Sequence, residues 1–115
     1  MQGFAGERVL MRIHIGERDR YHGRPLADAI VELLRARNYA GATVLRGIAG
    51  FGATARLHTD RILRLSLDLP IIIECVETQE NVDTILPVLD EMIGGGLITL
   101  EKVQVRIYRP ETTSS

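Results

Sequence analysis

The residues whose types and spacing are most suited to binding lie between positions 47 and 68. Gly47, Gly50 and Gly52 interrupt what begins as an apolar strand, and Phe51 stands between the last two glycines. Glycines that flank an aromatic ring let a flat ligand approach the backbone closely, so this run is a candidate ligand site. The charged side chains of the segment come next, namely Arg56, His58, Asp60, Arg61 and Arg64. Its arginines predict a contact surface for an acidic partner protein.

The histidine of this segment has two interpretations. His58, next to Thr59 and Asp60, could supply half of a metal site or an acid/base pair. Adjacent polar residues in a loop more often hydrogen-bond to one another in a turn, so we predict no metal site and leave His58 as the one candidate ligand. The arginines also have a plain interpretation, as a solvated loop face.

A second glycine group, Gly94–Gly96, follows an apolar helical stripe. One glycine is enough to end a helix in the left-handed conformation, so Gly94 could be only a cap. Three in succession leave backbone amides free to approach a phosphate, although the dipole at a helix C-terminus opposes an anion. Both interpretations stay open.

Four strands must position these residues. The first runs from Arg8 to Ile15, where apolar side chains alternate with Arg12 and His14, the pattern of a strand covered on one side. The other predicted strands are Ala42 to Ile48, Leu69 to Glu77 and Ile98 to Tyr108.

Two helices complete the pattern. The first starts with Pro25 at its first helical position and continues to Arg37. Thr78 opens the second, with acidic residues in its first turn, and the glycine triplet ends it. Pro87 lies inside this second helix, where proline costs about 3 kcal/mol unless the helix kinks or its early turns are irregular.

The order strand, helix, strand, strand, helix, strand predicts an α+β, ferredoxin-like βαββαβ fold. Its sheet is four-stranded and mainly antiparallel, with both helices on one face. We predict a single domain over residues 1–115, with a core at 8–109, a long excursion at about 47–68 and a disordered tail at 111–115.

One face of this sheet has no helix to cover it. We expect that face to carry polar side chains mixed with Leu10 and Tyr108, the polar ones being Arg12, His14, Lys102, Gln104 and Arg106. A half-polar sheet face of this kind is either solvated or buried in an assembly, and we favour an assembly.

Composition excludes several classes of protein. Fourteen basic and fifteen acidic residues give a formal charge of −1, which argues against a general binder of nucleic-acid phosphates. The single cysteine, Cys75, lies in an apolar run, so a reducing, cytoplasmic location is the default. Neither a signal peptide nor a membrane span is expected, and no catalytic motif such as G-x-S-x-G or a Walker loop is present, so we predict that the chain is not an enzyme.

Several motifs resemble those of the PII signal-transduction proteins. The run Gly50 to Gly52, then His58-Thr59 and Leu69-Pro70, resembles the G-F-G that opens the PII T-loop and the leucine-proline that closes it. The chain is similar over residues 8–109 to a PII-like family, domain-of-unknown-function family 190. The motifs of that family are found here at His22 to Leu26, Arg46 to Gly52 and Asp68 to Glu74.

The resemblance implies a homotrimer with ligand sites in the clefts between subunits. PII proteins bind adenine nucleotides there, using residues that match Gly50, Phe51 and Gly52 and a loop that matches Gly94, Gly95 and Gly96. Lys102 and Arg106 are the nearest matches to the basic residues of that site. Ala53 and Leu97 depart from basic residues of the PII pattern.

The function predicted is therefore that of a PII-like regulatory protein. It binds a small effector, predicted to be an adenine nucleotide, in intersubunit clefts and contacts a partner protein through the 47–68 loop. The alternative is a divalent-metal-binding or tolerance protein like the related CutA proteins, and a third reading is a purely structural partner with an empty cleft.

Overall fold

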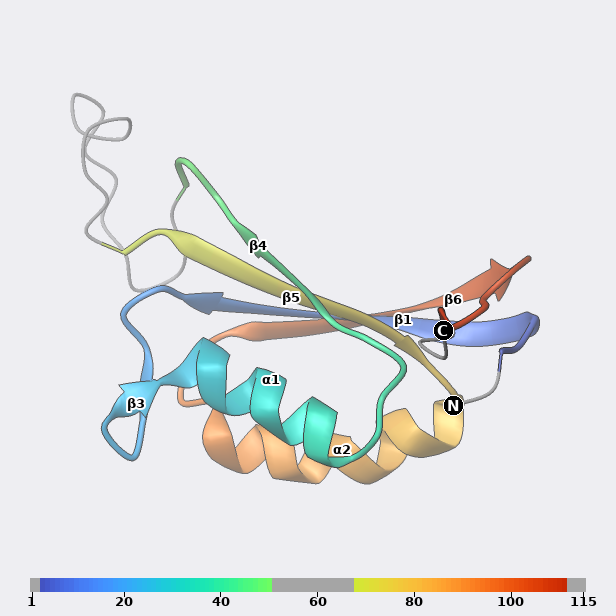
Figure 1. Ribbon diagram of the computed structural model, residues 1–115. Coiled ribbons are helices and arrows are strands. Elements are labelled where there is room, and N and C mark those ends of the chain that lie inside the picture. Colours follow the sequence, from blue (N-terminus) through green and yellow to red (C-terminus); the bar gives the residue numbers. More distant parts are fainter. Residues whose placement is uncertain (1–2, 51–67, 112–115) are drawn as a thin grey trace.

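The computed structural model describes residues 3–50 and 68–111 of the chain. Its main sheet has the order β4-β5-β1-β6, and each neighbouring pair is antiparallel. The four strands are β1 (Gly6–Gly16), β4 (Thr43–Arg46), β5 (Pro70–Glu77) and β6 (Leu97–Val105). Helices α1 (Leu26–Ala36) and α2 (Gln79–Met92) lie side by side on one face of this sheet (Figure 1). The predicted α+β, ferredoxin-like arrangement is confirmed.

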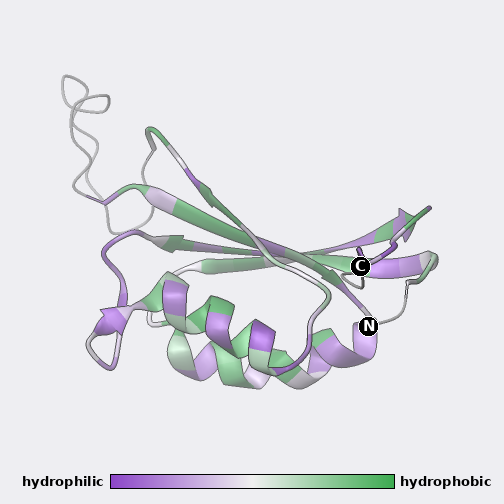
Figure 2. Ribbon diagram, viewed as in Figure 1, coloured by the Kyte–Doolittle hydropathy of each residue, from purple (hydrophilic) through white to green (hydrophobic). Residues whose placement is uncertain are grey.

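The core lies between the helices and the central strands. Met11 and Ile13 of β1 are fully buried, and they stand opposite Cys75 and Ile73 of β5 on the same face. The helices contribute the buried side chains Leu26, Ile30, Leu34, Val82, Ile85 and Leu89. Both helices alternate between hydrophobic and hydrophilic residues, as Figure 2 shows. Each large side chain buried in this way contributes about 1.5–3 kcal/mol to stability.

The prediction for the face of β6 was wrong. Lys102 pairs with Val9 and Gln104 with Glu7, which places both on the helix side of the sheet, because paired residues of antiparallel strands point the same way. Val103 therefore lies on the open face. β6 is an edge strand, and the helices cover little of it beyond Ile98, so the alternation of apolar residues along β6 does not report which face is covered.

A short hairpin connects β1 to α1, in addition to the four predicted strands. β2 (Arg20–Tyr21) pairs with β3 (Arg24–Pro25), and the two residues between them have positive φ angles, 51° for His22 and 79° for Gly23. A two-residue turn with both φ positive matches the right-handed twist of the flanking strands. Pro25 thus precedes the first helical residue instead of occupying it.

Helix α2 begins where it was predicted and contains Pro87. The hydroxyl of Thr78 caps it by accepting a hydrogen bond from the backbone N–H of Asn81 at 3.1 Å. Pro87 is exposed, so water can reach the backbone carbonyl of Asp83 that its missing N–H leaves unpaired. Neither described helix is long and apolar enough to span a membrane.

We predict that Gly96→Ala destabilises the fold by about 1–3 kcal/mol, since overpacking at a rigid position carries a cost of that size. A Cβ on Gly96 would lie 2.6 Å from the backbone oxygen of His14. Chemical denaturation measures the loss. Gly95→Ala is the matched control, because a Cβ there meets no atom within 4 Å. Equal stability of the two variants would contradict the packing role of Gly96.

We predict that the fold loses stability in alkali, because a thiol and a phenol group are buried in it. Burial raises the pKa of the Cys75 thiol from 9.0 to about 12 and the pKa of Tyr39 from 10.0 to about 12. The folded state keeps these protons at pH values where the unfolded chain has lost them, so the free energy of unfolding falls as pH rises from 9 towards 12. Denaturant titrations at about pH 8 and about pH 10.5 measure the difference. Cys75→Ala should show a smaller fall, and an unchanged slope would contradict the role of the thiol.

Candidate functional site

The two glycine groups predicted to bind a ligand lie at the same end of the sheet but at opposite edges. β4 ends at Arg46, opposite Ile71, and Gly50 follows it, whereas β6 begins just after Gly96 with Leu97 opposite His14. β4 and β6 are three strand spacings apart, about 14 Å. One chain alone therefore does not join the two groups in a single site.

Lys102 and Arg106 lie towards the other end of the sheet. Lys102 is about 17 Å along β6 from Leu97, at about 3.3 Å per residue. Arg106 follows Val105, which pairs with Gly6 at the start of β1. The chain thus separates these basic side chains from the glycines with which they were grouped.

Seven of the predicted site residues lie outside the described part of the chain. They are Phe51, Gly52, Arg56, His58, Asp60, Arg61 and Arg64. Within residues 3–50 and 68–111, no group of three or more histidine, cysteine or acidic side chains is placed to hold a metal ion. The metal-binding alternative depends on His58 and stays a prediction.

The hollow beside Gly94–Gly96 does not suit a phosphate. It lies between α2 and the start of β6, and Asp83 and Asp90 line it together with Leu97 and other apolar residues. Within the part of the chain that the structure describes, no lysine or arginine lines it. The acidic groups and the carbonyl end of the helix both oppose an anion.

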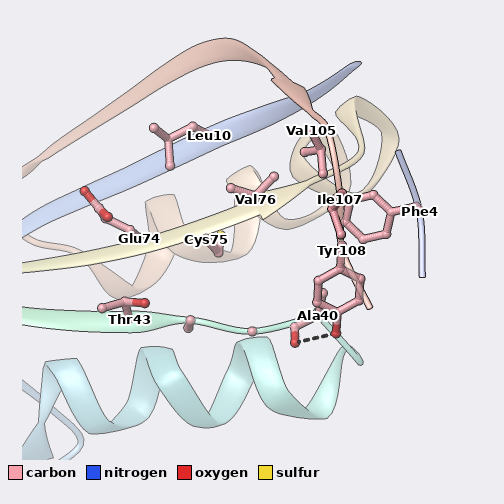
Figure 3. A pocket seen from close by; sticks show the side chains of 12 residues that line it. Phe4, Leu10, Ala40, Thr43, Glu74, Cys75, Val76, Val105, Ile107 and Tyr108 are labelled. Carbon is pink, nitrogen blue, oxygen red and sulfur yellow. Dashed lines mark hydrogen bonds between the residues drawn. The ribbon is translucent and has the colours of Figure 1, made fainter. Parts of the chain in front are cut away.

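A second candidate ligand site lies on the open face of the sheet, in a groove of 440 Å³ (Figure 3). Leu10, Val76 and Val105 lie along its sheet side, and Phe4 and Tyr108, whose rings stack at 4.8 Å, form an aromatic wall. The other lining residues are Ala40, Gly41, Ala42, Thr43, Glu74, Cys75 and Ile107. Sequence reasoning missed this site because its residues come from four strands and both ends of the chain.

Hydrogen bonds to α2 and β5 fix the chain on one side of the groove. The hydroxyl of Tyr39 donates to the backbone oxygen of Asn81 at 2.8 Å, and the N–H of Ala40 donates to the buried carboxylate of Glu77 at 3.3 Å. The ladder between β4 and β5 starts only at Thr43, opposite Glu74. Within the described residues, the edge of β5 beyond Glu74 therefore has no strand beside it.

Comparison with known proteins shows the family of the chain. The family model DUF190, described as Uncharacterized ACR, matches residues 8–105. The chain belongs to the DUF190 family. It is 38% identical over 104 residues to a UPF0166 protein of Methanocaldococcus jannaschii, covering 90% of this chain and 94% of that one. A UPF0166 protein of Aquifex aeolicus is 34% identical over 101 residues, covering 86% and 93% of the two chains.

In this DUF190 chain, one short turn holds both flanks of the 47–68 segment. Glu17 pairs with Arg46 before the segment, at 2.6 Å, and its backbone N–H donates to Leu69 after it, at 2.8 Å. The N–H of Arg18 donates to the carboxylate of Asp68 at 2.9 Å. A Cβ on Gly47 would lie 2.6 Å from Pro70, so close packing requires glycine there. The base of the segment is thus a fixed structure.

We predict that Asp68→Ala speeds the hydrogen exchange of the Arg18 amide, since the variant removes its acceptor. Amide exchange followed by NMR measures the effect. The Glu17 amide is the internal control, because its acceptor is a backbone oxygen that the variant keeps. Asp68→Asn retains an acceptor oxygen and should restore much of the protection. Unchanged exchange at Arg18 in the alanine variant would show that this contact does not hold the turn.

Proposed function

We propose that this DUF190 chain is a PII-like regulatory protein. In this proposal it binds a small effector, an adenine nucleotide, in clefts between the subunits of a homotrimer. It contacts a partner protein through its 47–68 loop and has no catalytic activity of its own. The groove on the open sheet face is the observation that supports the proposal most directly.

The groove has the chemistry of a nucleobase site. A purine ring needs apolar or aromatic surface against its faces, and Leu10, Val76 and Tyr108 supply such surface. The rim of the purine ring carries hydrogen-bond donors and acceptors in one plane. Backbone groups of β5 beyond Glu74 are available to pair with them, because the ladder between β4 and β5 starts only at Thr43.

Exposed apolar side chains support self-association. Among the described residues, the large hydrophobic side chains that stay exposed lie on or just after the two edge strands, as Val44, Leu45 and Ile48 at β4 and Leu97, Leu100 and Ile107 at β6. Exposed edge strands are unpaired templates for another chain. A heterologous contact between the β4 edge of one copy and the β6 edge of the next would close a ring such as a trimer.

The link from effector to partner would pass through β4. Thr43 lines the groove and Arg46 pairs with Glu17 at the base of the 47–68 segment, so the two ends of one four-residue strand connect the sites. An effector can control the loop in this way only if it binds the loop states with different affinity.

We expect adenine nucleotides to raise the unfolding free energy of the full chain. A ligand of the native state at about a hundred times its dissociation constant adds about 2.7 kcal/mol. Thermal unfolding with adenosine, AMP, ADP and ATP measures this. Gly41→Val should abolish the rise, because a side chain at this groove position enters open space and takes up ligand volume without a clash.

Gly94→Val is the matched variant for the glycine triplet, since a Cβ there also meets no atom within 4 Å. Loss of the rise in this variant alone would move the effector site from the groove to the triplet. No rise with any adenine compound in the unmodified chain would overturn the sensor function. A stable monomer in sedimentation would remove the intersubunit clefts.

A further inference from the structure

We propose that Glu74 determines which heterocycle the groove accepts. Its carboxylate accepts a hydrogen bond from the exocyclic amino group of a 6-aminopurine, and it therefore rejects the 6-oxo counterpart. This inference rests on the proposed effector site in the groove and adds the group that the protein reads.

The first observation is a free acceptor atom on a fixed carboxylate. Glu74 lines the groove, and its Oε2 accepts a hydrogen bond from Nε of Arg12 at 2.9 Å (Figure 3 shows the side chain). Its Oε1 has no partner among the described residues. Arg12 is not a lining residue, so it restricts the carboxylate without occupying the groove.

The second observation is the charge around this carboxylate. Arg12 also pairs with Glu101, at 3.3 Å, so one cation serves two carboxylates and the cluster keeps a formal charge of −1. Among the described residues, no lysine or arginine lines the groove. A ligand group that donates a hydrogen bond complements this negative cluster, whereas a carbonyl oxygen would face another acceptor.

The third observation is the neighbour of Glu74 across the sheet. Thr43 stands directly opposite Glu74 in the β4–β5 ladder, and both line the groove at the point where that ladder ends. A hydroxyl both donates and accepts, so it can pair with a ring nitrogen next to the amino group. The carboxylate can only accept, and it carries the discrimination between an amino and an oxo group.

Adenosine and inosine are the probes for this choice. They differ at position 6, where an amino group faces an oxo group, and at N1, which carries a hydrogen only in inosine and which the Thr43 hydroxyl can pair with in either form. We expect calorimetric titration of the full chain to give an affinity for adenosine about 10-fold or more above that for inosine, the cost of leaving an acceptor unpaired. Glu74→Gln keeps the shape but offers both a donor and an acceptor, so the preference should fall to about 3-fold or less.

Glu101→Gln is the matched control. Like Glu74→Gln, it replaces a carboxylate that pairs with Arg12 by an amide. Glu101 does not line the groove, so the preference for adenosine should persist. Glu74→Asp provides a second variant should the glutamine variant unfold: it keeps the charge, withdraws the acceptor, and should weaken adenosine binding more than inosine binding.

Two results would overturn the inference and are distinguishable from each other. Binding of adenosine and inosine with equal affinity by the unmodified chain would remove the role of Glu74 and leave the effector function standing. Binding of neither probe, together with silence across the nucleotide panel, would remove the effector function itself.

Discussion

The structure depends on the fact that two helices cover only one face of a four-stranded sheet. Strand β1 meets this constraint by alternation, since Met11 and Ile13 point to the helices while Arg12 and His14 point away. The opposite face must then be stabilised in some other way. Arg12 does part of this by pairing with Glu74 and Glu101 across three adjacent strands. Apolar side chains such as Leu10 and Val76 line the groove on this face beside Glu74.

The chain between α1 and β4 forms one side of the groove. It is held at Ala40 by a hydrogen bond to Glu77, and it does not pair with β5 before Thr43. Glu77 is buried, and it accepts hydrogen bonds from the N–H groups of Ala40 and Thr78 and from the side chain of Asn81. These bonds hold Ala40 to the start of α2. The small residues that follow do not pair with β5 until Thr43. A structural carboxylate, Glu77, thus lies close to a groove that another carboxylate, Glu74, lines.

Under the proposed function, the effector groove and the base of the partner-binding loop lie at different ends of the sheet. The groove lies near the start of β1, and the base of the 47–68 segment lies where β1 ends at Gly16. β4 is the shortest strand of the main sheet and touches both. A change in the position of so short an edge strand costs few ladder bonds, so under the proposed function β4 would be the path between the effector and the loop.

The sequence by itself determined the order of the two helices and of the four strands in the main sheet, the buried face of β1, the cap of α2 at Thr78 and the family. These features depend on local periodicity and on motifs that are contiguous in the chain. It could not determine the face of β6, because an edge strand beyond the reach of the helices loses the link between alternation and burial. Nor could it determine the groove, which brings Phe4, Thr43, Glu74 and Tyr108 together from distant parts of the chain. Only the tertiary structure decided these points, since strand register and the packing of the chain ends are non-local.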